Sequence, residues 1–186
     1  KITIIQENGD VEYYHANNIH EVANTKDTIK HIIFGKDMKN DDLGEEMFIN
    51  CKKLKTIHFA GSQITILDNA VFEGCTSLTS TGLEDSEVTE LGDRVFESCT
   101  SLKSTSLLNS KVTTLGDSVF KYCTNLGNSE EIDRLNDWGE NKGRNNLEYN
   151  VESSAFDKTY ITMKIDDNDL TFNTTLKSIT INGLAE

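Results

Sequence analysis

A short phrase, F-x-x-C-x-x-L, recurs along this chain at a fixed spacing of 24 residues, beginning at Phe48, Phe72, Phe96 and Phe120. A period of this length indicates a solenoid, because a single unit cannot bury its own apolar face and must stack on its neighbours. Solenoids present long surfaces that suit binding. The repeat therefore favours binding over catalysis, although it does not identify a ligand.

Two further apolar segments complete each repeat. After the cysteine comes a strand-like phrase such as Leu54-x-x-Ile57-x-Phe59, which is typical of leucine-rich repeats. A second apolar pair follows, such as Val88 and Leu91, and the next phenylalanine comes five residues later. The same frame fits residues 29–34 upstream and 151–181 downstream. We therefore predict a leucine-rich repeat solenoid, mostly β with short turns and helical pieces, of about seven rungs.

The two clearest repeat lines, Val88–Phe96 and Val112–Phe120, both read V-T-x-L-G-D-x-x-F. Together with F-x-x-C-x-x-L, they resemble the BspA-type leucine-rich repeats. The resemblance covers residues 29–126 well and 151–182 loosely. It implies a surface-exposed or secreted protein that takes part in adhesion and protein binding and is not an enzyme.

The ends of the chain depart from the repeat. Residues 1–14 read as a β-hairpin in which Asn8-Gly9 forms a two-residue turn, because glycine adopts positive φ without strain. We assign residues 1–28 to an N-terminal hairpin cap, which a solenoid needs to cover its exposed core. Residues 29–186 form the repeat domain, with an insertion at 127–150 that shifts the frame. Insertions in solenoids map to loops on one face, often the binding face.

The formal net charge of −13 constrains the partners. An acidic surface repels phosphate backbones and anionic lipid headgroups, so we expect neither nucleic-acid nor membrane-surface binding. The basic cluster at Lys52, Lys53 and Lys55 is interpreted as a solvated face. No apolar run is long enough to span a bilayer. The chain begins at Lys1, so we expect that a targeting segment has been removed or that the chain is part of a longer protein. We expect a monomer.

The four cysteines, Cys51, Cys75, Cys99 and Cys123, share one slot of the repeat. They lack the paired C-x-x-C spacing of a zinc site and have no histidine at ligand spacing. We therefore expect buried free thiols that form hydrogen bonds with the backbone, and no metal or other cofactor. Disulfides between neighbouring rungs are geometrically conceivable, but side chains in one column point alike rather than at each other.

The main candidate surface is the outer face of the parallel strands, where residues alternate with the buried leucine-type positions. His31 and His58 are expected to hold the same strand position in neighbouring rungs. Trp138 and Arg144, in the insertion, are better anchors for a partner, because hot spots favour Trp, Tyr and Arg. A solvated sheet surface without a partner is the simpler alternative. The predicted partner-binding residues are His31, Ile33, Thr56, His58, Ser80, Gly82, Ser104, Ser106, Leu108, Trp138, Arg144, Ser178 and Thr180.

Three functions remain open at this point. The first is a surface-displayed or secreted module that binds a protein or a glycan. The second is a rigid spacer that presents another domain. The third is a metal-dependent hydrolase, for which the sequence supplies many carboxylates but no motif that gives any of them a role. We expect the first, with no catalytic residues.

Overall fold

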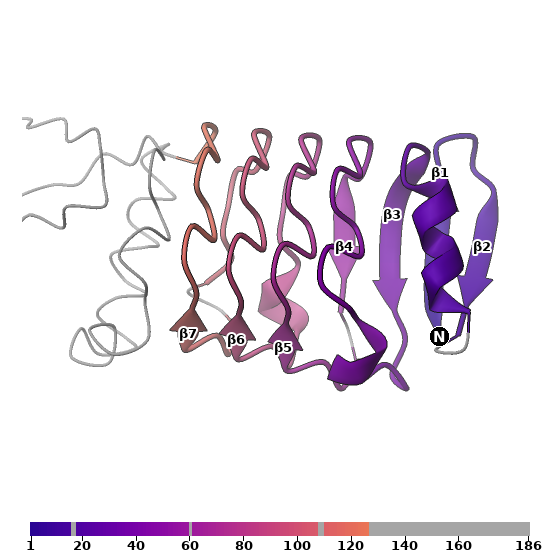
Figure 1. Ribbon diagram of the computed structural model, residues 1–186, viewed down its shortest axis with the longest axis horizontal. Coiled ribbons are helices and arrows are strands. Elements are labelled where there is room, and N and C mark those ends of the chain that lie inside the picture. Colours follow the sequence, from indigo (N-terminus) through magenta and orange to yellow (C-terminus); the bar gives the residue numbers. More distant parts are fainter. Residues whose placement is uncertain (16–17, 60, 108–109, 127–186) are drawn as a thin grey trace, which may run out of the picture.

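The computed structural model describes residues 1–15, 18–59, 61–107 and 110–126 (Figure 1). Short strands dominate these residues, and the helical pieces are all single 3-10 turns or slightly longer. The strands form two sheets, with the orders β2-β1-β3-β4 and β5-β6-β7. The elements are β1 (Ile2–Gln6), β2 (Val11–Tyr14), η1 (Ile19–Thr25), β3 (Ile29–Phe34), η2 (Asn40–Asp42), β4 (Thr56–His58), β5 (Ile66–Leu67), η3 (Leu83–Asp85), β6 (Glu90–Leu91) and β7 (Thr114–Leu115).

Successive repeats wind into coils that lie side by side (Figure 1). The sheet β5-β6-β7 shows the register most directly, because its strands are parallel and pair residues that are 24 positions apart. Leu67 lies opposite Leu91, and Leu91 lies opposite Leu115. All three leucines are buried, so one apolar position of the repeat becomes a column through the core.

The recurrent phenylalanines form a second column. The ring centroids of Phe48 and Phe72 are 5.5 Å apart, and those of Phe72–Phe96 and Phe96–Phe120 are each 5.7 Å apart. The rings are nearly parallel, with interplanar angles of 7–9°. All four side chains are fully buried. The prediction that these phenylalanines pile up in register, rather than occupy separate cores, is confirmed.

The segment that carries each phenylalanine is linked to the next coil by backbone hydrogen bonds, although it is not a strand. The amide of Phe72, for example, donates to the carbonyl of Val95 at 3.0 Å. Each copy bends at two residues with positive φ, one just before the cysteine and one two residues before the phenylalanine, and this prevents an extended conformation. These residues are Glu46, Ala70, Arg94 and Ser118, and Asn50, Gly74, Ser98 and Tyr122.

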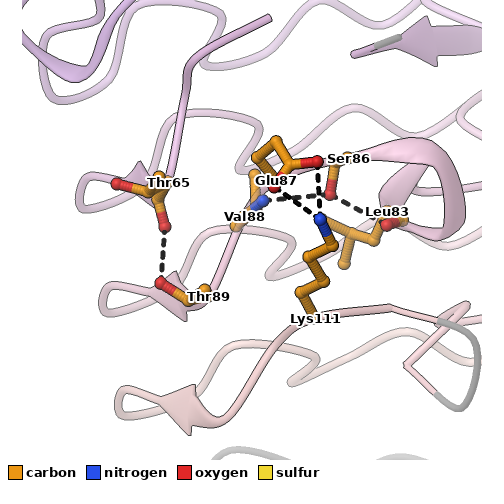
Figure 2. Close-up of polar contacts among 7 residues, drawn as sticks. All are labelled: Thr65, Leu83, Ser86, Glu87, Val88, Thr89 and Lys111. Atoms are coloured by element: carbon orange, nitrogen blue, oxygen red, sulfur yellow. Dashed lines mark hydrogen bonds and ion pairs between the residues drawn. The ribbon is translucent and has the colours of Figure 1, made fainter. Parts of the chain in front are cut away.

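Polar side chains also join coils at the repeat spacing (Figure 2). The Nζ of Lys111 lies 2.5 and 2.6 Å from the two carboxylate oxygens of Glu87. The hydroxyl of Thr89 donates to the carbonyl of Thr65 at 3.2 Å, one coil away. Both pairs are exposed, so they add little to stability and mainly fix the register of neighbouring coils.

The predicted strand phrase is a strand only in the first two coils, at β3 and β4. In the next two coils it is reduced to one parallel bridge between Ser80 and Ser104. The prediction of a continuous strand there is wrong, and the cause is a buried threonine. The hydroxyl of Thr81 donates to the carbonyl of Thr105 at 2.8 Å and accepts from the amide of Leu83 at 3.4 Å. Such local side-chain bonds compete with a sheet ladder.

The N-terminal hairpin exists and extends the repeat sheet. Strand β1 pairs with β2 and also with β3, both antiparallel, while β3 and β4 are parallel. The predicted two-residue turn is wrong: the loop has three residues, with the amide of Gln6 donating to Asp10 (2.9 Å) and the amide of Gly9 donating to Gln6 (3.0 Å). Gly9 has φ 92°, which is the left-handed position that such loops require.

One face of this four-stranded sheet is covered. In Figure 1, η1 crosses in front of β1, and its Val22 is buried in the same core as Ile2, Ile4 and Ile32. The other face of the sheet carries no helix from the described residues. The insertion at 127–150 and the rungs expected at 151–181 lie outside the described residues. The predicted total of about seven rungs therefore stays a prediction.

Candidate partner-binding surface

The structure brings together four of the predicted site residues on the outer face of β3 and β4. His31 lies opposite Thr56, and Ile33 lies opposite His58. Further along the stack, Ser80 and Ser104 lie opposite each other and are half-buried. Gly82 and Ser106 are also half-buried and have positive φ, so they belong to turns rather than to the predicted strand face. The predicted residues that lie outside the described residues are Leu108, Trp138, Arg144, Ser178 and Thr180.

The hairpin continues this face across β1 and β2. The sheet register lines up two rows of outward-facing residues, one running Tyr13, Thr3, Ile33, His58 and the other running Val11, Ile5, His31, Thr56. Directly opposed residues on neighbouring strands point to the same side of a sheet. We call this surface the N-terminal sheet face, and it comprises Thr3, Ile5, Val11, Tyr13, His31, Ile33, Thr56 and His58.

This face holds the exposed large hydrophobic side chains of the described residues. Val11 is 48% exposed, Tyr13 56% and Ile33 37%. The Nζ of Lys1 lies 3.8 Å from the centroid of the Tyr13 ring, a cation–π contact that holds the ring against the surface. A gathering of exposed apolar side chains on one face is typical of an interaction site, and tyrosine is frequent among binding hot spots.

Two histidines lie at one end of this face. They do not share a strand position, as the sequence suggested, because the register sets His31 opposite Thr56 and His58 two residues further along. The hydroxyl of Thr56 connects them instead, at 2.8 Å from Nδ1 of His31 and 3.2 Å from Nε2 of His58. Burial lowers the pKa of His31, with smaller contributions from the charges of Lys30, His58 and Lys55. His31 is therefore held neutral at pH 7.

The cysteines lie away from this face, inside the coils. All four are free and fully buried. The Sγ atoms of Cys75, Cys99 and Cys123 each donate to the carbonyl of the phenylalanine in the preceding coil, at 3.3, 3.3 and 3.0 Å. Burial raises the pKa of each of these three thiols. The predicted hydrogen bonds to the backbone are confirmed for these cysteines, which are structural and chemically unreactive.

Two kinds of feature are absent from the described residues. Among them, no group of three or more His, Cys, Asp and Glu side chains is arranged to hold a metal ion. Within the same ranges, no helix has the length and apolar character that a membrane crossing would need. The surface that stands out is the partly apolar outer face of the sheet β2-β1-β3-β4, which suits contact with another macromolecule.

Sequence reasoning missed the hairpin half of the face. The sequence places Val11 and Tyr13 in the predicted hairpin cap, outside the predicted strip of outward-facing repeat residues. The signal was available in the alternation of β2, where Val11 and Tyr13 are exposed while Tyr14 is buried. What the sequence did not reveal is that β1 lies between β2 and β3, which joins the hairpin to the repeat sheet.

Comparison with known proteins gives one clear result. A family model described as BspA type leucine rich repeat region matches residues 17–147 of the 186-residue chain, in six copies. No curated protein and no solved structure matches the chain. The match spans the coils described above and agrees with the repeat lines of the sequence. The chain belongs to the family of BspA-type leucine-rich repeat proteins.

Proposed function

We propose that this chain is a non-catalytic binding module, displayed on a cell surface or secreted, and that its partner is a protein that docks on the N-terminal sheet face. The observation that supports the proposal is the concentration of Val11, Tyr13 and Ile33 on one side of one sheet, with Val11 and Tyr13 on its edge strand β2 and Ile33 on β3. Leucine-rich repeat modules commonly bind proteins, and the BspA type is typically found at the surface or outside the cell, which agrees with this role.

The stacked coils serve this function by rigidity. Backbone bonds, the leucine column and the phenylalanine column tie each coil to the next, and we propose that the whole repeat region is one continuous solenoid that acts as a monomer. A rigid sheet presents its side chains to a partner without a large ordering cost. A glycan is a less suitable partner, because the exposed aromatic contribution of the face is the single ring of Tyr13.

The proposal is tested by surface variants in an adhesion assay. Beads that carry the chain are applied to a panel of purified extracellular proteins and, in parallel, to a glycan array. The double variant Tyr13→Ser/Ile33→Ser removes two of the three exposed large apolar side chains of the face. Glu90→Ser, at an exposed position on β6, serves as the control. We expect a protein that is bound by the unmodified chain and by the control, and lost with the double variant.

Two results would contradict the proposal. Equal binding by the double variant would place the site elsewhere. The rigid-spacer function would be favoured instead by two observations together. The unmodified chain would bind no protein on the panel, and its deletion from a longer protein would bring a neighbouring domain closer to its point of attachment.

A further inference from the structure

A row of lysines borders the N-terminal sheet face and continues along the stack. Lys30, Lys55, Thr79 and Lys103 hold equivalent positions in consecutive coils. The amide of Lys55 donates to Lys30 at 2.8 Å, that of Thr79 to Lys55 at 3.2 Å, and that of Lys103 to Thr79 at 3.3 Å. Each of these residues directly precedes an outer-face residue of its coil: His31, Thr56, Ser80 and Ser104. The fold thus places cations at a spacing of about 4.8 Å per coil beside the face, with one gap at Thr79.

Lysines of this region lie close to the same groups of the hairpin loop and the sheet face. Lys53 forms an exposed ion pair with Glu7 of the hairpin loop. The hydrogen bond and charge of Lys53 lower the pKa of Glu7, and Lys30 and Lys55 add to that effect. Lys30 and Lys55 also act on His31, as described above. The carboxylate of Glu7 in the hairpin loop therefore lies against Lys53 and close enough to Lys30 and Lys55 to be influenced by their charges.

This local charge is opposite to that of the molecule. The chain carries a formal charge of −13, and the far end of the strand phrase holds the exposed carboxylates of Glu84 and Asp85 on η3. A long polyanion laid on the lysine row would extend into that acidic surface and be repelled. A compact acidic segment would not, because surface charges are screened beyond about 8 Å at physiological salt.

We infer that the N-terminal sheet face recognises an acidic protein segment, with apolar side chains that contact Tyr13, Val11 and Ile33 and carboxylates that face Lys30 and Lys55. The inference rests on the proposed function and specifies its partner. Lys55, which belongs to the lysine cluster that the sequence suggested to be a solvated face, becomes in this arrangement part of the charged rim of the binding surface, together with Lys30. Rim charges of this kind mainly set partner choice and association rate.

Synthetic peptides of one design test the inference without knowledge of the natural partner. Three peptides share the same tyrosine and leucine positions and carry glutamate, glutamine or lysine at the positions between them. Binding to the full chain is measured by fluorescence anisotropy over a salt series, and the site is mapped from the NMR signals of His31 and Ile33. We expect the glutamate peptide to bind most tightly, to shift those signals, and to weaken as salt is added.

Charge-reversal variants identify the source of the preference. In Lys30→Glu/Lys55→Glu, we expect the affinity for the glutamate peptide to fall on the order of tenfold, and the lysine peptide to become the preferred one. Lys121→Glu is the matched control, because Lys121 follows Phe120 directly, on the segment whose backbone pairs with Ser98, and not on the sheet face. It should leave the preference unchanged. The milder Lys30→Gln/Lys55→Gln covers the case in which the reversal prevents folding.

The outcomes separate this inference from the function on which it depends. Equal binding of the glutamate and glutamine peptides, with both lost in Tyr13→Ser/Ile33→Ser, would overturn the acidic preference and leave the binding face intact. Tighter binding of heparin or of a single-stranded oligonucleotide than of the glutamate peptide would overturn it in favour of a polyanion. No response of any peptide to either set of variants would overturn both proposals.

Discussion

At the scale of single residues, the structure buries the cysteines of the repeat and places the histidines of the sheet face at the surface. The cysteines are hidden, and each of the three that form a described hydrogen bond donates its thiol to a carbonyl of the neighbouring coil. The histidines of the sheet face lie on its outer side, where His31 is half-buried and His58 is exposed. The repeat therefore places its cysteines in the core and these two histidines at the surface.

The buried cysteines predict unreactive thiols. Because burial raises the pKa of Cys75, Cys99 and Cys123, the reactive thiolate form is scarce and also shielded. We expect the folded chain to react negligibly with a thiol reagent at neutral pH, and the unfolded chain to release the signal of all four free cysteines. Rapid modification of the folded chain, or fewer than four thiols after unfolding without a reductant, would contradict this assignment.

His31 predicts a specific pH dependence. Its pKa is lowered in the folded state, so between that value and the unfolded value of about 6.5 the unfolded chain binds more protons. The free energy of unfolding should therefore fall as the pH drops through this interval and level off below it. Titration of the imidazole by NMR should give a pKa below the ordinary histidine value, and Lys30→Gln should raise it by removing a positive neighbour.

The matched variant for this pH dependence is His31→Gln, which should lose the part of it that arises from this residue. An imidazole that titrates at or above the ordinary value would contradict the partly buried position of His31.

At the scale of elements, close stacking of the coils depends on small residues at fixed positions. A Cβ added to Gly116 would lie 2.6 Å from Oδ1 of Asp93, 2.7 Å from the carbonyl carbon of Gly92 and 2.8 Å from the amide nitrogen of Asp93. Two of these atoms belong to the backbone of the preceding coil, so neither can move without moving the coil itself. This contact explains why a glycine stands at this position in the two clearest repeat lines, since an added Cβ at Gly92 would also lie close to the backbone of the preceding coil, 3.1 Å from the amide nitrogen of Asn69.

Gly116→Ala should therefore destabilise the chain by about 1–3 kcal/mol through overpacking, as measured by denaturant unfolding. Gly44→Ala is the control, because an added Cβ there meets no atom within 4 Å, and it should change stability by less than about 0.5 kcal/mol. Equal effects of the two substitutions would show that the coils are not in contact at Gly116.

The sequence predicts the elements that follow from the fixed repeat period better than those that depend on contacts between coils. The phenylalanine and cysteine slots were predictable, because a fixed period constrains what must stack. The strand at residues 29–34 was also correct, because these residues fit the strand phrase of the repeat one unit upstream. The short strands of the second sheet, such as Glu90–Leu91, carry no pattern long enough to read. The turn at Thr81 was not predictable, because it depends on a hydrogen bond to a carbonyl one coil away.

The candidate site was predictable only in part for the same reason. His31, Ile33, Thr56 and His58 follow from alternation along two repeat strands. Their neighbours Val11 and Tyr13 join them through an antiparallel pairing that no repeat register encodes. The two halves of the face form one surface because of the strand order, which local sequence patterns do not reveal.

At the scale of the whole molecule, the described coils form one stack with the β1–β2 hairpin at its N-terminal end. The stack orders the core, and the hairpin extends the β3–β4 sheet into the surface on which the proposed function depends. Each coil contacts its immediate neighbours, so stability should be transmitted from coil to coil rather than across the molecule. The phenylalanine column is the feature in which this nearest-neighbour behaviour is easiest to measure.

The most direct test of the stacked-coil account is a pair of double-mutant cycles on the free energy of unfolding, with phenylalanine changed to leucine. Phe72 and Phe96 stack at 5.7 Å, and the account predicts a coupling of about 0.5–1.5 kcal/mol between them. Phe48 and Phe120, separated by the two intervening rings, should be additive within about 0.5 kcal/mol. Additivity of the adjacent pair, or equal coupling in both pairs, would contradict the account.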